Sequence, residues 1–169
     1  MTILKILTYP NKNLRKIAKP VKEINLKIKK IIHDMIKTMH FNNGIGLAAT
    51  QVNIPLKIIV ITENINNNKV MVFINPKIIE KSEFIRSKEG CLSIPNYEFF
   101  IKRYKYIKMQ ALNILGQTII IETDSLLSIC IQHEIDHLNG ILFIDYLSSL
   151  QKEILNKKII KLQKLSTKI

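Results

Sequence analysis

Residues 130–140, CIQHEIDHLNG, place two histidines and a glutamate in the spacing His-Glu-x-x-His: His133, Glu134 and His137. Residues four positions apart on a helix lie on the same face, so both imidazoles point to one place and the carboxylate lies beside them. Many metal-dependent hydrolases hold their ion in this way. A pair of hydrogen-bonded core histidines is the alternative, but it does not explain the whole combination. The stretch therefore predicts a metal site.

The downstream sequence does not supply a further ligand for such an ion. In the extended pattern of one class of zinc peptidases the next histidine would fall on Phe143, and the only downstream glutamate, Glu153, is too close to the motif. The third ligand is therefore expected upstream. Cys91, in the Gly-containing loop KEGCLSIP (88–95), is the candidate. One thiolate and two imidazoles leave the fourth position of a tetrahedral ion open for water, as a catalytic site requires.

Cys130 is the rival sulfur ligand, because it lies one turn before the motif. On the same helix its side chain is poorly placed to converge with both imidazoles on one ion, so we predict a packing role for it. The chain shows no export signal, and both cysteines are therefore expected as thiols in a reducing compartment.

The elements that must position these residues show both helical and strand periodicities. Apolar residues recur at helical spacing over 24–41, which predicts an amphipathic helix. The apolar, β-branched segments 57–62 and 69–75 predict one hairpin, and 106–113 with 118–123 predict a second.

The helix that carries the motif is expected to be capped by Asp124 or Thr123 and to end at Leu138, with Gly140 just past its end. Apolar residues lie on two sides of this helix, so it belongs in the middle of a domain and its histidines face an interior cleft. Further apolar residues at helical spacing over 150–165 predict a terminal helix whose other face is Lys-rich.

Length and composition indicate a single domain over residues 1–169, with 148–169 as a basic C-terminal helix. Without a signal, transit or membrane-spanning segment, a soluble cytoplasmic protein is expected. The net charge of +13 comes mostly from lysine, since the only arginines are Arg15, Arg86 and Arg103. Attraction to polyanions is one interpretation. A general bias towards Lys, Ile and Asn is the preferred one, because no aromatic-and-basic motif in the sequence accompanies the charge.

The segment GIGLAATQVNIP (44–55) contains Gly-x-Gly, but it has no lysine and no preceding strand, so a phosphate-binding loop is not expected. Its small residues allow close backbone approach, and Gln51 offers an amide donor.

Three segments, GIGLAATQV (44–52), EGCLSIP (89–95) and QHEIDHLNG (132–140), resemble the three signature motifs of the bacterial peptide deformylases in order and separation. The similarity runs over nearly the whole chain, from LRKIAKPV (14–21) to GILFIDYLSSL (140–150). The resemblance implies an α+β fold with antiparallel β-sheets around a central metal-binding α-helix, an N-terminal helix and a C-terminal helix. It also implies removal of the formyl group from the N-terminal formyl-methionine of new polypeptides, with release of formate.

Motif by motif, the resemblance implies a role for each matching residue. Metal ligands would be Cys91, His133 and His137. Catalytic residues would be Glu134, as general acid and base, with Gln51 and the backbone N–H of Leu92 as oxyanion donors. Gly46 would lie beside the site, and Ile45 and Gly90 would border the bound peptide. A divalent ion, expected as Fe²⁺ with Zn²⁺ or Ni²⁺ able to replace it, would activate the attacking water.

The residues that precede the histidines on the same side of the helix, Leu126, Ile129 and Cys130, are expected to wall a pocket for the methionine side chain, with Ile45 opposite. Ordinary core packing is the alternative. The match is less typical after SIP, where Lys102 stands at a position that the family often fills with proline. That departure concerns the local loop shape and the substrate rim, not the chemistry.

Two other functions fit parts of the sequence. One is a zinc endopeptidase with an unusual Cys ligand, and the other is a non-enzymatic RNA-associated or ribosome-docking module. For a deformylase the expected partners are formyl-Met nascent peptides and no membrane, and the protein is expected to be a monomer. Ribosome docking through the basic C-terminal helix is the further hypothesis, based on Lys152, Lys157, Lys158, Lys161 and Lys164.

Overall fold

The computed structural model describes residues 2–64 and 69–166, with side chains described except at 63, 64 and 160–166. The helices are α1 Leu26–Phe41, α2 Leu126–Leu138 and α3 Ser149–Ser166, with short 3-10 turns η1 Lys12–Arg15, η2 Ala49–Val52 and η3 Phe143–Tyr146. The strands are β1 Gly46–Ala48, β2 Ile58–Asn64, β3 Lys69–Cys91, β4 Ile94–Leu112 and β5 Thr118–Thr123. These elements confirm the α+β class.

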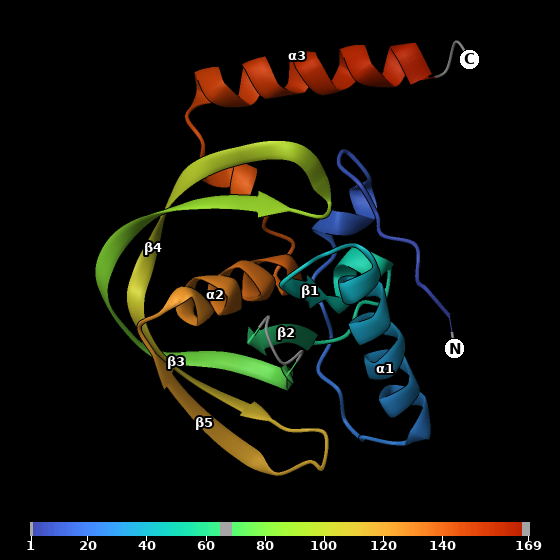
Figure 1. Cartoon of the computed structure of the whole chain (residues 1–169), viewed down its shortest axis with the longest axis vertical. Coiled ribbons are helices and arrows are strands. Elements are labelled where there is room, and N and C mark those ends of the chain that lie inside the picture. The colour runs from blue at the N-terminus through green and yellow to red at the C-terminus, as the bar shows by residue number, and fades with distance from the viewer. Residues whose placement is uncertain (1, 65–68, 167–169) are drawn as a thin grey trace.

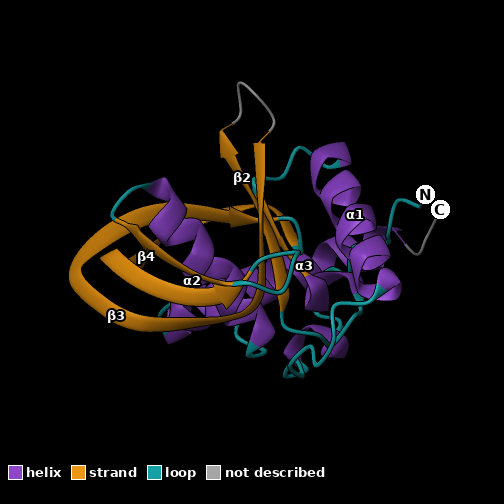
Figure 2. Ribbon diagram, turned by 90° about the horizontal axis from the view of Figure 1, so that it is seen from below, coloured by secondary structure: helices purple, strands orange, loops and turns teal. Residues whose placement is uncertain are grey.

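The strands form one antiparallel sheet in the order β1-β2-β3-β4-β5, so each strand pairs with its sequence neighbour. Both expected hairpins are confirmed, because Ile59 lies opposite Phe73 and Met109 lies opposite Ile121. The sheet curls so that the long β3–β4 hairpin passes around α2, which lies at the centre of the molecule (Figures 1 and 2).

The length of the β3–β4 hairpin was not expected from the sequence. Residues 88–95 are not an open loop, because β3 runs to Cys91 and β4 begins at Ile94 after a tight turn. Lys102 likewise lies in β4, paired with Arg86 of β3. Residues 79–86 of β3 are all exposed, so this part of the strand has no buried apolar face and its period-2 signal is weak.

Strand β2 is buried on both of its faces. Ile58 and Val60 pack towards α1, whereas Ile59 and Ile61 pack towards α2, and all four are at most 1% exposed. Because side chains alternate along a strand, this single strand joins the core under α1 to the core under α2. The helix with the histidines therefore rests on a fully buried strand.

The caps of the two core helices set their start points. Asn25 caps α1 by accepting a hydrogen bond from the Ile28 backbone. The expected cap of α2 at Asp124 or Thr123 is wrong, because the Ser125 side chain accepts from the Leu127 backbone. Thr123 instead ends β5, and its hydroxyl accepts from the Ser125 backbone N–H. The Thr123 hydroxyl is thus engaged in the strand-to-helix connection.

A third cluster joins η1, η3 and the start of α3 to the inner side of β4. Leu155 is the anchor of α3 in this cluster at 2% exposed, whereas Leu150 and Ile154 remain exposed. Leu162, Leu165, Lys161 and Lys164 lie outside the residues whose side chains are described. Among the described residues, none of the helices is long and apolar enough to cross a membrane.

Candidate metal centre and catalytic cleft

Helix α2 carries both histidines of the motif on its buried side. His133 is 8% exposed and His137 is 1% exposed, and their ring centroids are 5.0 Å apart. The 3.6-residue period brings the two rings together one turn apart, as expected for the His-Glu-x-x-His spacing.

Cys91 reaches the histidines from the end of β3. Its Sγ lies 3.2 Å from Nε2 of His137, and the ligand atoms of Cys91, His133 and His137 all lie within 4.8 Å of one another. A soft thiolate with two imidazoles is a donor set for a divalent transition metal, and three protein ligands leave one position for a water or substrate. The residues present therefore fit one such ion.

Glu89, next to the turn that carries Cys91, orients His133. Its Oε2 lies 2.8 Å from His133 Nδ1. A carboxylate can only accept, so Nδ1 carries the proton and Nε2 is left to face the cluster. Burial opposes the charged imidazole, but hydrogen bonds with Cys91 and Glu89 outweigh it and hold the pKa of His133 well above its ordinary value. His137 differs, because burial and the nearby His133 hold its pKa well below the ordinary value.

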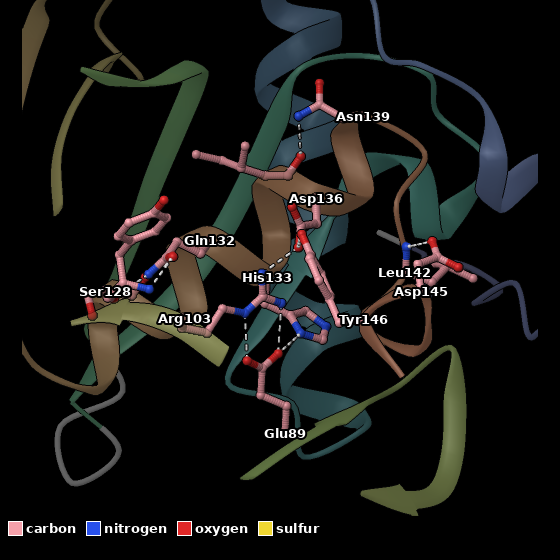
Figure 3. A network of polar contacts seen from close by, with 12 residues as sticks. Glu89, Arg103, Ser128, Gln132, His133, Asp136, Asn139, Leu142, Asp145 and Tyr146 are labelled. Atoms are coloured by element: carbon pink, nitrogen blue, oxygen red, sulfur yellow. Dashed lines mark hydrogen bonds and ion pairs between the residues drawn. The ribbon is translucent and has the colours of Figure 1, made fainter. Parts of the chain in front are cut away.

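Arg103 links Glu89 to helix α2 (Figure 3). Its Nε and Nη2 donate to the two oxygens of Glu89 at 2.7 and 2.9 Å, and its Nη1 donates to Asp136 at 2.5 Å. Asp136 also accepts from the Tyr146 hydroxyl at 2.9 Å. Burial raises the pKa of Glu89, but hydrogen bonds from Arg103 and His133 outweigh that effect and lower it overall. Glu89, Arg103 and Asp136 therefore all have hydrogen-bond partners of opposite charge within this network.

Glu134 points into the cleft beside the cluster. It is 5% exposed, and its Oε2 has no hydrogen-bond partner within the described part of the chain. Burial raises the pKa of Glu134 to about 7, against the opposing effect of His133. A carboxyl that titrates near neutral pH suits proton transfer in both directions. Gly46 packs against this carboxylate, and a Cβ there would overlap with Oε1.

Gln51 lies on η2 with its amide fixed at both ends. Its Oε1 accepts from the Ala48 backbone at 2.8 Å, and its Nε2 donates to Ser93 Oγ at 3.1 Å and lies 3.5 Å from Cys91 Sγ. The donor end therefore faces the metal cluster. Leu92 follows Cys91 in the β3–β4 turn and lines the same cleft.

A cleft of about 970 Å³ opens over the cluster. Ile45, Gly46 and Gly90 line it, as do Leu126, Ile129 and Cys130 of α2. Ile45 and Leu126 are 41% and 59% exposed, so the apolar wall is open at its rim. The structure thus brings every site residue expected from the sequence to the cluster or to this cleft.

Cys130 is not part of the metal cluster. It is 8% exposed and packs in the core under α2 while it also borders the cleft. Burial, followed by the charges of Glu134 and Glu89, raises the pKa of its thiol to about 12. The group therefore stays protonated at neutral pH and contributes an apolar surface.

Sequence reasoning missed the residues that support the cluster: Glu89, Ser93, Arg103, Asp136 and Tyr146. One signal was available for Arg103. The chain uses lysine almost throughout, and an arginine in such a chain indicates a place where a planar, two-pronged donor is needed.

A thiolate, two imidazoles and a buried carboxylate at the base of a cleft form the site of a metal-dependent hydrolase. Comparison with known proteins identifies the family. Residues 3–153 match the family described as polypeptide deformylase. The chain is 60% identical over 164 residues to the peptide deformylase of Buchnera aphidicola subsp. Schizaphis graminum, an alignment covering 97% of this chain and 98% of the relative.

Solved structures agree with this family assignment. A crystal structure of a peptide deformylase from Legionella pneumophila matches with a TM-score of 0.91 at 37% identity and covers 99% of both chains. The peptide deformylase from Ehrlichia chaffeensis in complex with actinonin matches with a TM-score of 0.90 at 39% identity, over 95% of this chain and 98% of that one. The chain therefore belongs to the polypeptide deformylase family, whose members are metal-dependent enzymes that deformylate new polypeptides. The resemblance seen in the three motifs is confirmed.

Proposed function

We propose that the chain removes the formyl group from formyl-methionine at the start of new polypeptides, with Cys91, His133 and His137 holding one divalent ion. The observation that carries these assignments is the convergence of the three ligand atoms within 4.8 Å. Glu134 lies beside them with one carboxylate oxygen unpartnered among the described residues. Such an oxygen suits the role of general acid and base.

The chain's own groups divide the chemistry as follows. A bound divalent ion would polarise the formyl carbonyl and lower the pKa of a water towards about 7. Glu134 takes one proton from the attacking water and returns it to the amine nitrogen as the C–N bond breaks, which leaves formate and a free amino terminus. Gln51 Nε2 and the Leu92 backbone N–H donate to the oxygen that gains negative charge. Losing one such donor typically costs about 3 kcal/mol of transition-state stabilisation.

The working ion in this proposal is Fe²⁺, with Zn²⁺ and Ni²⁺ able to bind the same residues. The thiolate of Cys91 supports a softer ion than oxygen ligands would select. We expect the Fe²⁺ or Ni²⁺ form to turn over much faster than the Zn²⁺ form. Metal-free protein reconstituted with each ion under anaerobic conditions tests this, and equal rates would contradict it.

The apolar wall of the cleft is proposed as the methionine pocket. Leu126, Ile129 and Cys130 on α2 face the cleft that Ile45 also lines, and their surfaces suit an unbranched apolar side chain. Gly90 and Ile45 border the path of the peptide backbone in this assignment, and Gly46 leaves room for Glu134.

We also propose that residues 1–169 act as one catalytic domain, a cytoplasmic monomer that docks on the ribosome through α3. Lys157 and Lys158 are exposed on this helix, whereas Lys152 donates to the Asp145 backbone. Deleting α3 would uncover the Leu155 cluster, so charge reversal is the cleaner test. Lys157→Glu with Lys158→Glu should weaken ribosome co-sedimentation at low salt, and unchanged sedimentation would contradict docking.

The deciding experiment measures formate release from formyl-Met-Ala-Ser under anaerobic conditions, with the bound metal quantified. Glu134→Ala should keep the metal and lose turnover. Glu98→Ala is the matched control, because it removes another carboxylate that lines the cleft. Full turnover by Glu134→Ala would contradict its role, and cleavage of internal bonds in unformylated peptides would indicate an endopeptidase instead.

A further inference from the structure

The β3–β4 hairpin carries a second set of side chains on the side of its strands opposite to Glu89, Ile101 and Arg103, and one of them, Tyr104, also packs against the core cluster that includes Ile131 of α2. We call this set the outer face, and it consists of Phe84, Arg86 and Lys88 on β3 with Phe100, Lys102 and Tyr104 on β4. Residues alternate along a strand, and the intervening Glu89, Ile101 and Arg103 are buried on the α2 side. Phe84 and Phe100 are 57% and 60% exposed, and the Phe84 ring centroid lies 4.4 Å from that of Tyr104.

Cations accompany these rings. Lys102 Nζ lies 3.8 Å from the centroid of the Phe84 ring, and Arg86 Cζ lies 5.8 Å from that of Phe100. Lys81 Nζ lies 4.4 Å from the Tyr104 ring. Two of the four cation–π pairs found in the described part of the chain therefore lie within the outer face, and a third joins its Tyr104 to Lys81. No such pattern is visible in the sequence, because the register of two strands assembles it.

The register also orders the outer face. Lys88 pairs with Phe100, Arg86 with Lys102, and Phe84 with Tyr104, so a pair of cations stands between two aromatic positions. Successive positions on one face of a strand are about 7 Å apart. Glu98 is the acid next to these cations on the same side, and Lys88 neutralises it at 2.6 Å. The surface is therefore positive and carries rings at intervals.

The chemistry of the outer face selects among anionic partners. An acidic peptide would use the cations but would leave the rings uncovered. A duplex buries its bases and offers phosphates alone. Single-stranded RNA offers both phosphates for cations and unstacked bases for exposed rings, and sheet-borne aromatics are a common means of binding it.

We propose that the outer face binds single-stranded RNA without reading its sequence. The Phe84 and Phe100 rings stack on bases, and Arg86 and Lys102 neutralise the phosphates between them. Lys88 and Glu98 also line the catalytic cleft, so RNA bound here lies next to the cleft mouth. RNA binding uses none of the residues assigned to deformylation, so it can be tested independently of the reaction.

The test titrates the metal-loaded, full-length protein into a fluorescently labelled uridine 12-mer and follows anisotropy at 50 and 200 mM salt. Phe84→Leu with Phe100→Leu keeps apolar bulk and removes both rings. This variant should weaken binding at least about tenfold without changing the salt dependence. Arg86→Ala with Lys102→Ala should weaken binding and reduce the slope of log K against log salt by about 1.4.

Lys27→Ala with Lys30→Ala on the exposed side of α1 is the matched control, because it removes the same charge elsewhere. It should change binding far less than the outer-face pair. All variants should deformylate a short formyl peptide at the wild-type rate, which reports intact folding. If the Phe84→Leu, Phe100→Leu variant bound the RNA with wild-type affinity, the proposal would be overturned, because binding would then depend on charge alone. Equal affinity for an acidic 12-residue peptide, with the same losses in the variants, would overturn it in favour of a peptide partner.

Discussion

The two faces of the β3–β4 hairpin are made by alternate residues of the same strands, yet they differ in almost every physical respect. On the inner face Glu89 and Arg103 are 6% and 4% exposed, and each charge has defined partners. On the outer face Phe84 and Lys102 are exposed, and their contact joins a ring to a cation. A hairpin can thus support a buried site and present a separate surface with one backbone.

The two faces differ because a buried charge needs a partner and an exposed charge does not. On the inner face, removing a charge from water costs free energy unless its partner is present and well placed, so each inner charge depends strongly on the others. Outside, water replaces any lost partner, and an exposed pair such as Lys88 with Glu98 contributes about 0–1 kcal/mol. Substitutions on neighbouring residues should therefore have very different effects.

Arg103→Met should have the largest effect. It leaves Glu89 without its two-pronged donor and Asp136 without its cation, and removing one partner of a buried pair costs about 3–5 kcal/mol of unfolding free energy. Lys102→Met, one residue away on the outer face, should cost less than about 1 kcal/mol. Urea denaturation of the metal-loaded proteins measures both, and equal losses would mean that the two faces do not differ as described.

Glu89→Gln should weaken metal binding by about 10–100-fold, because His133 loses the carboxylate that fixes its orientation. Glu98→Gln, on the same hairpin but exposed, should leave metal affinity unchanged. Competition with a chelator of known affinity gives both values. A wild-type affinity in Glu89→Gln would show that His133 needs no such support.

The inner carboxylate should also shape the response to acid. The pKa of folded Glu89 lies below its ordinary value of 4.5, so the unfolded chain takes up this proton first as the pH falls. The resulting stabilisation is complete above the unfolded pKa and is lost as the pH falls through the lower folded value. In metal-free protein, Glu89→Gln should flatten the decline in stability below about pH 4.5. Denaturation midpoints across pH 3–7 test this, with Glu98→Gln expected to keep the wild-type slope.

Phe84→Leu should have the smallest effect. It removes the ring under Lys102, and an exposed cation–π contact is worth about 0.5–1 kcal/mol. Thermal unfolding measures the change. A decrease of more than about 2 kcal/mol in the free energy of unfolding would show that Phe84 contributes to the core.

Much of the molecule follows from local patterns in the sequence. The 3.6-residue period predicts α1 and α2, and β-branched segments predict the paired ends of the hairpins, because these patterns reflect burial on one side or both. Residues 79–86 of β3, in the middle of the β3–β4 hairpin, are all exposed, so this stretch gives little period-2 contrast. The contacts of Arg103 with Glu89 and Asp136 depend on strand register and on the position of α2, and neither can be obtained from spacing alone.

The candidate site also contains residues that local spacing predicts and residues that it does not. His133, Glu134 and His137 share one helix, so their spacing alone predicts their proximity. Cys91 comes from a distant segment, and the need for another ligand pointed to it. The support around these residues was missed because Glu89 was read as part of a loop, whereas it lies at the buried end of a strand.

Gln132 covers part of the edge of β4. Its side-chain amide accepts from the Tyr104 backbone N–H at 3.0 Å and donates to the Tyr104 carbonyl at 2.7 Å, so it occupies the edge of β4 as a neighbouring strand would (Figure 3). β5 pairs with β4 only over Ile107–Leu112 and leaves this stretch of the edge to α2. An unpaired edge is a template for association between chains. Helix α2 therefore also protects the sheet against aggregation, and we expect a chain whose central helix has loosened to self-associate through β4.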